Sequence, residues 1–221
     1  MSTTTGTREL RFEQKMSDAE ALMWNIEKDP WLNPSGAIIS TLDRPLDVKQ
    51  FKARIRSAVA DIPRLRERVV PGFGRLSPPT WATDPEFDLA YHVRHIALPV
   101  PGTERQLLDL ATRLYEDPFD RTRPLWMFVC IDGLDSGRGA VFSKMHHTVT
   151  DGVGAIRLSE RYIEAEREAP VPEFVDLDQV IANAVAAEHA DDENVCGVSS
   201  VDSLRRSLSH ATRRQTGFAR R

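Results

Sequence analysis

Two adjacent histidines, His146 and His147, precede Asp151 and Gly152 in a short polar stretch of the chain. Histidine is the side chain best suited to accept a proton near neutral pH. The aspartate could orient or charge-balance an imidazole, or it could tie the loop to a distant arginine. The glycine would let a substrate or a neighbouring backbone come close. The stretch therefore indicates a site at which a proton is moved.

The segments on either side predict what positions these residues. Residues 139–145 have the composition of a buried strand, and residues 153–167 that of a helix. The histidines then lie at a strand end in a strand–loop–helix unit, a common place for chemistry in α/β folds. If strand geometry continues through the pair, His146 and His147 point to opposite faces.

Other segments accompany this motif in a fixed order. Pro124-Leu125-Trp126 precedes it, and the chain opens with an apparent helix at 16–24, followed by segments at 47–66 and 87–93. The His-His-x-x-x-Asp-Gly pattern is shared by acyltransferases that resemble chloramphenicol acetyltransferase, and condensation domains and carnitine acyltransferases carry related versions. In combination, residues 16–168 resemble the amino-terminal lobe of the bacterial wax ester synthase/diacylglycerol acyltransferase family.

This resemblance implies a fold and a reaction. The fold would be α/β, a chloramphenicol-acetyltransferase-like lobe with a mixed sheet flanked by helices, plus a partly helical C-terminal extension. The chain would transfer a fatty acyl group from acyl-coenzyme A to a diacylglycerol or a long-chain alcohol. The attack would be direct, in a ternary complex, with acyl-coenzyme A as co-substrate and no cofactor.

The resemblance also assigns roles within the motif. It makes His147 the general base, with His146 in a supporting or packing role. Asp151 would shape the loop by pairing with an arginine, and Gly152 would meet a backbone requirement. The alternatives are a histidine that only packs in the core, or a metal site shared by His147 and Asp151. No cluster that would supply a third ligand is evident, so we expect no metal.

The residues before the motif have two interpretations each. Pro124, Leu125 and Trp126 could help to line the substrate channel, or they could simply begin a strand with a large buried aromatic. Arg121 and Arg123 could meet the phosphates of coenzyme A, or they could be solvated or paired with nearby acids.

Composition narrows the setting. Hydrophobic residues make up 41% of the 221-residue chain, and 29 basic against 33 acidic residues give a net charge of −4, so no nucleic-acid partner is expected. Two cysteines argue against a disulfide framework, and residues 1–15 lack a secretory signal, so we expect a cytoplasmic protein. The arginine-rich segment at 204–221 leaves open peripheral contact with the inner membrane or lipid bodies.

The predicted organisation is a flexible arm at 1–15, the acyltransferase lobe at 16–168, and a linker with a basic tail at 169–221. Because the family has two lobes, the chain looks like an amino-terminal half. That leaves an alternative function, a non-catalytic or partner-dependent lobe that binds lipid, a second lobe or another copy of itself. A domain that takes acyl groups from carrier proteins is a further possibility, against which Pro124-Leu125-Trp126 argues.

Periodicity and turn signals also predict individual elements. Helices are expected at 17–26, 47–62, 104–115, 153–167 and 176–189, with a weaker signal at 201–212. Strands are expected at 37–42, 65–70, 80–82, 89–96, 124–131 and 140–145, and residues 191–200 are expected to be flexible.

Overall fold

A mixed four-stranded sheet forms the centre of the computed structural model, which describes residues 14–29, 31–72, 77–150, 152–163, 166 and 169–196. Its strand order is β1-β6-β5-β4, in which β4 and β5 are parallel and the other pairs are antiparallel. The four strands are β1 (Ser35–Leu42), β4 (Val93–Ala97), β5 (Trp126–Asp132) and β6 (Gly139–His146). The predicted mixed sheet is confirmed.

Helices and a small hairpin surround this sheet. The hairpin consists of β2 (Glu67–Val70) and β3 (Thr80–Thr83). The helices are α1 (Asp18–Ile26), α2 (Val48–Asp61), α3 (Leu89–His92), α4 (Glu104–Glu116), α5 (Gly152–Ser159) and α6 (Leu177–Cys196), with 3-10 turns at Pro63–Leu65 and Asp135–Gly137. Most of these helices begin where the sequence predicts, because a capping side chain accepts the first free amides. Ser17 caps α1 and Asp47 caps α2.

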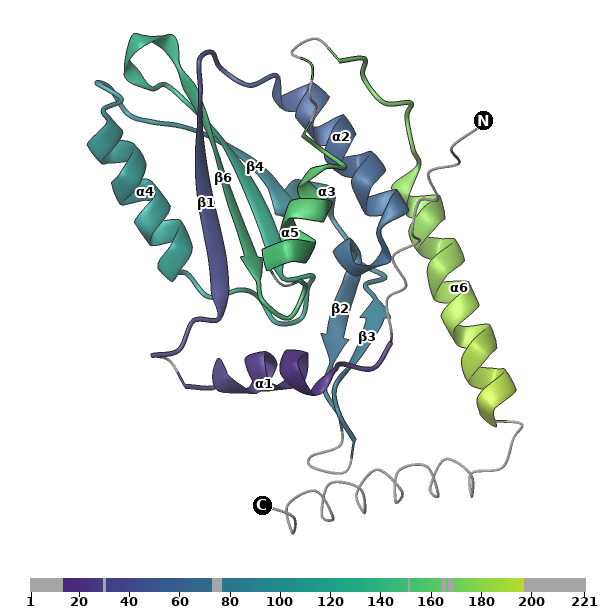
Figure 1. The fold of residues 1–221 in the computed structure, drawn as a ribbon. Helices are drawn as coiled ribbons and strands as arrows, with labels where there is room; N and C mark the ends of the chain where they lie inside the picture. The colour runs from purple at the N-terminus through teal and green to yellow at the C-terminus, as the bar shows by residue number, and fades with distance from the viewer. Residues whose placement is uncertain are drawn as a thin grey trace, which may run out of the picture.

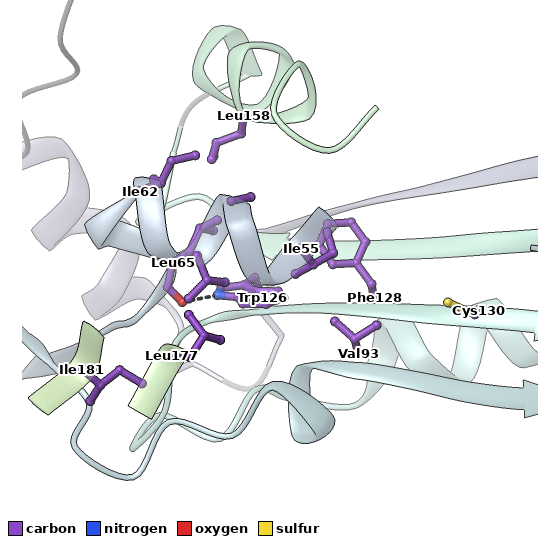
Figure 2. Close-up of a cluster of buried hydrophobic side chains, with 12 residues drawn as sticks. Ile55, Ile62, Leu65, Val93, Trp126, Phe128, Cys130, Leu158, Leu177 and Ile181 are labelled. Carbon is purple, nitrogen blue, oxygen red and sulfur yellow. Dashed lines mark hydrogen bonds between the residues drawn. The ribbon is translucent and has the colours of Figure 1, made fainter. Parts of the chain in front are cut away.

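The sheet is covered by different helices on its two faces (Figure 1). On one face, Ile55 of α2, Leu158 of α5 and Leu177 of α6 pack with Trp126 and Phe128 of β5 (Figure 2). On the other face, Leu107 and Ala111 of α4 pack against the sheet. The sheet contributes Val129 and Ile131 from β5 and Phe142 from β6 to this core. The central strand β5 is therefore mostly buried, whereas β1, at the edge of the sheet, is largely exposed.

One predicted strand is partly wrong. Residues 89–96 were expected to be extended throughout, but Leu89–His92 form the short helix α3 and only then does β4 begin. The cause is local, because the carboxylate of Asp88 accepts the amide of Ala90 at 2.8 Å and caps one helical turn. The strand predicted at 65–70 likewise starts later, at Glu67, because Pro63–Leu65 form a 3-10 turn.

Two predicted helix ends also differ. The helix expected at 153–167 ends at Ser159, where the hydroxyl donates to the carbonyl of Ile156 at 2.7 Å, and the amides of Arg161 and Tyr162 then donate to carbonyls three residues earlier. In contrast, α6 runs on to Cys196, into the segment expected to be flexible. The helix expected at 201–212 lies outside the described residues.

Helix α6 is attached to the lobe at both ends of its packed surface. Leu177 and Ile181 belong to the same core as Trp126. Farther along, the carboxylate of Glu188 accepts the amide of Thr83 at 3.0 Å and its hydroxyl at 2.6 Å. The division of the chain into arm, lobe and linker stays a prediction, and the structure adds that α6 shares the lobe's core.

Candidate functional site

His147 lies just beyond the end of β6, at the edge of the sheet that β1 forms. Its amide donates to the carbonyl of Pro34 at 2.9 Å, which holds the backbone against the start of β1. The side chain is exposed and extends over Gly36, where an added Cβ would lie 3.9 Å from Nε2 of His147. The glycine therefore leaves open space next to this imidazole.

His146 points the other way and is completely buried, as strand alternation predicts. Its Nδ1 accepts the backbone amide of Thr148 at 3.0 Å and lies 2.8 Å from the hydroxyl of the same residue. Since Nδ1 is an acceptor, the ring proton of the neutral form lies on Nε2. That atom is 3.5 Å from Oε2 of Glu27, the residue that follows α1.

Glu27 connects His146 to an arginine. Oε2 of Glu27 is 3.3 Å from Nη1 of Arg121, whose Nη2 donates to the carbonyl of Trp24 at 2.9 Å. The guanidinium of Arg121 also stacks 3.4 Å above the ring of Trp24. Burial favours the neutral form of Glu27, but His146, Arg121 and Lys144 together lower its pKa below the usual value. The side chain is therefore a carboxylate at neutral pH.

Lys144 lies two residues before His146 on the same buried face of β6. Its ammonium donates to the carbonyls of Leu114 and Asp117, at 3.3 and 2.5 Å, and lies 4.6 Å from the ring centre of Phe119. Burial lowers the pKa of Lys144, although Asp117 and Glu27 oppose that shift. This face of β6 thus carries a compact set of buried charges, while the opposite face carries His147.

The predicted substrate-contacting motif is buried. Pro124, Leu125 and Trp126 all belong to the interior, and the indole N–H of Trp126 donates to the carbonyl of Leu65 at 2.7 Å (Figure 2). The carbonyl of Leu125 accepts the amide of His146 at 3.0 Å. The packing interpretation is therefore what the structure shows, and a role in substrate binding stays a prediction.

The remaining predicted residues divide into three cases. Asp151 lies outside the described residues. Gly152 begins α5, and a Cβ added there meets no other described atom within 4 Å, so the space beside it is open. Arg121 is held by Glu27 and Trp24, whereas Arg123 pairs with Asp120 at 3.6 Å, as the sequence suggested.

Sequence reasoning missed the residues that support the histidine pair. Glu27, Thr148 and Gly36 were not singled out, because two of them come from segments more than a hundred positions away. The signal available for Thr148 was its place in the motif, two residues after His146, which is a spacing at which a side chain can accept a backbone amide.

Two further features of the described part of the chain bear on ligands. A cavity of about 340 Å³ lies between α2 and α6, lined by Lys52, Arg56, Phe87 and Phe174, and His147 is not among its lining residues. Within the described ranges, histidine, cysteine and carboxylate side chains do not gather in groups of three that could hold a metal ion.

Across the described residues, every helix is too short or too polar to cross a bilayer. The arginine-rich segment at 204–221 lies outside those residues, so peripheral contact with a membrane stays a prediction.

Comparison with known proteins places these features in a family. A sequence model of the wax ester synthase/diacylglycerol acyltransferase catalytic domain matches residues 16–220. A Mycobacterium tuberculosis protein named as a diacylglycerol O-acyltransferase is 32% identical over 160 residues, which cover 72% of this chain and 33% of that protein. A second one, named tgs2, is 39% identical over 122 residues, which cover 55% of this chain and 27% of that protein.

Solved structures agree with these sequence matches. The wax ester synthase/diacylglycerol acyltransferase from Marinobacter aquaeolei VT8 superposes with a TM-score of 0.61 at 26% identity, covering 74% of this chain and 40% of that one. The first condensation domain of the calcium-dependent antibiotic synthetase gives 0.58 at 22% identity, covering 78% and 43%, which shows the shared fold. The matched residues cover about a third or less of the length of these two mycobacterial relatives. The predicted chloramphenicol-acetyltransferase-like fold is confirmed, and the chain belongs to the wax ester synthase/diacylglycerol acyltransferase family.

Proposed function

We propose that this chain supplies the catalytic base of an O-acyltransferase that moves a fatty acyl group from acyl-coenzyme A to a diacylglycerol or a long-chain alcohol. The observation that carries the proposal is the contrast between the two histidines. His147 is exposed over the open space at Gly36, whereas His146 is buried against Glu27. Of the pair, only His147 can meet a substrate hydroxyl.

The chemistry follows from that position. An alcohol becomes nucleophilic enough when a base within hydrogen-bond reach withdraws its proton during attack. The imidazole of His147 takes the proton as the alcohol oxygen bonds to the thioester carbonyl carbon. The carbon–sulfur bond then breaks, and the imidazolium returns the proton to the coenzyme A thiolate. Such a base contributes about 10²–10⁴-fold to the rate.

The test is acceptor-dependent release of coenzyme A by the purified chain. Palmitoyl-coenzyme A would be supplied with hexadecanol or a diacylglycerol, and we expect His147→Ala to reduce release to the background rate. His95→Ala is the matched control, because His95 lies on the surface in a pair with Asp132. Turnover that survives in His147→Ala would contradict the proposed base.

A second candidate is a lobe that needs a partner to complete its site. It is favoured by Ile38, which is 65% exposed on the same face of β1 as Gly36. The partner would be a second lobe or another copy of this chain. Release of coenzyme A that rises more steeply than protein concentration, together with larger species in sedimentation, would support this candidate over an independently active lobe.

A further inference from the structure

The buried face of β6 carries contacts that reach from α1 to the loop holding His147. They run from Arg121 through Glu27 to His146, and from His146 to Thr148. We propose that Glu27 is a positioning residue for His147: its carboxylate, 3.5 Å from Nε2 of His146, favours the tautomer with the proton on that nitrogen, so Nδ1 stays available for the Thr148 amide and the backbone on both sides of His147 is fixed. This inference rests on the proposed role of His147 as the base.

The hydrogen bonds around His146 show how this positioning works. Its amide donates to Leu125, its carbonyl accepts the amide of Val149 at 2.9 Å, and its ring accepts the amide of Thr148. His147 lies between the anchored residues 146 and 148, so its own backbone has little freedom. The neutral ring can accept the Thr148 amide at Nδ1 in only one tautomer, the one with the proton on Nε2. A carboxylate facing Nε2 selects that tautomer.

The position of Glu27 in its helix supports a role beyond folding. Glu27 is the C-cap residue of α1. A negative charge at this end of a helix opposes the helix dipole and is unfavourable for the helix itself. In addition, its carboxylate is largely buried, with 12% of the side chain exposed. The negative charge of Glu27 therefore destabilises α1. The contacts of its carboxylate with His146 and Arg121 compensate for this cost.

Arg121 holds Glu27 in place from the other side. The arginine is anchored by the ring and the carbonyl of Trp24, in the helix that Glu27 follows. Glu27 is thus fixed between a cation and an imidazole from two other parts of the chain. His146 is fully buried, Glu27 is largely buried and Arg121 is partly buried. Burial strengthens the interactions among these three side chains and so defines their mutual orientation.

The experiment compares three substitutions on or beside α1. Glu27→Ala removes the carboxylate that faces Nε2 of His146 at 3.5 Å. Glu27→Gln keeps one acceptor oxygen at the same reach, so it should restore part of the function. Glu20→Ala is the matched control, because Glu20 accepts the Ser17 amide in the capping box of the same helix and does not contact His146. Each variant would be assayed for kcat and KM, and for hydrogen exchange at individual backbone amides.

We expect Glu27→Ala to lower kcat about 10- to 100-fold while KM changes less than about twofold, because the base is displaced and substrate contacts remain. We also expect the Thr148 amide to exchange about tenfold faster, while the amide of Val129 in β5 keeps its protection. Glu27→Gln should lie between Glu27→Ala and the wild type in both measurements, and Glu20→Ala should match the wild type. If Glu27→Ala does not fold, the same comparison is made with Glu27→Gln alone.

Three results would overturn the inference. The first is a Glu27→Ala variant with wild-type kcat and wild-type Thr148 exchange. The second is loss of protection at Val129 together with Thr148, which would mean general destabilisation. The third is an equal loss of kcat in Glu20→Ala. If the wild-type chain shows no turnover, the proposed function of the isolated chain fails, and Thr148 exchange in the Glu27 variants still decides the positioning role.

Discussion

His92 is an ionisable side chain that the fold keeps completely out of water. Its ring stacks 4.4 Å from that of Trp126 and 5.1 Å from that of Phe87, and Nδ1 donates to the carbonyl of Trp126 at 2.8 Å. Among described atoms, Nε2 has no hydrogen-bond partner, so a second proton would be unsatisfied. Burial lowers the pKa of His92 to about 4, although the bond to Trp126 opposes the shift.

This burial makes stability depend on pH with a definite sign. Between pH 6.5 and 4 the unfolded chain binds a proton at residue 92 that the folded chain excludes, so stability falls as the pH falls through that window. We expect the His92 contribution to cost about 2 kcal/mol between pH 7 and pH 5. Urea unfolding at the two pH values would measure it. His92→Gln should show a smaller loss on acidification, and an equal loss in both proteins would contradict the prediction.

Gly36 determines how much room His147 has. An alanine Cβ at this position would make an ordinary contact with Nε2 of His147, whereas a larger side chain would occupy the open space. We therefore expect Gly36→Ala to keep turnover within about threefold, and Gly36→Leu to lower kcat/KM at least about tenfold by displacing the proposed base, His147, or the substrate. Because Gly36 is exposed, the unfolding midpoints of both variants should stay close to the wild type. A Gly36→Leu variant with full activity would contradict this account.

At the residue scale, the sequence predicts the histidine motif but not the residues, such as Glu27, that contact it in the fold. The two histidines and their opposite orientations follow from local pattern, because alternation in a strand is a local property. Glu27 could not be predicted, since it meets His146 only through tertiary folding of a segment 119 residues earlier. The sequence pattern suggests that Arg121 pairs with a neighbouring acid, whereas in the fold it pairs with the distant Glu27.

Helix α6 is attached to the rest of the lobe by the apolar side chains of Leu177 and Ile181 and by the polar contact of Glu188. Its Glu188 satisfies both the amide and the hydroxyl of Thr83, a residue with only 5% of its surface exposed. We expect Glu188→Ala to destabilise the chain by about 1–3 kcal/mol, because a buried amide loses its acceptor. Urea unfolding would test this, with Gln179→Ala as a control on the same helix, where the side chain donates to Asn183. Equal stability of the two variants would contradict the anchoring role.

At the element scale, prediction succeeds where capping and periodicity agree. The helices that begin after Ser17, Asp47 and Thr103 are close to their predicted bounds, since each cap and its apolar stripe indicate the same start. Prediction fails at 89–92, where an apolar run suits both a strand and a helical turn and the Asp88 cap decides. Short apolar segments remain ambiguous by pattern alone.

At the scale of the whole molecule, the sheet separates two apolar cores. Ile55 belongs to the core under α2, and Leu107 belongs to the core under α4. We expect Ile55→Val to cost about 0.5–1.5 kcal/mol and Leu107→Ala about 2–5 kcal/mol. In the double variant the two costs should add within about 0.5 kcal/mol, because Ile55 and Leu107 belong to separate apolar clusters. Denaturant unfolding of all four proteins would show this, and a large coupling energy would mean that the cores act as one.

The sheet register carries a consequence for how the motif can be interpreted in related chains. Gly139 and His147 are separated by an even number of positions, and β6 is paired with β1 throughout, from Leu42↔Gly139 to Ser35↔His146. A deletion of one residue inside β6 would leave the two histidines intact in the sequence but reverse their parity relative to the sheet. His147 would then face the buried side, next to Glu27, and the exposed position would pass to Thr148. A matching motif therefore identifies an exposed second histidine only when the length of the strand before it is also preserved.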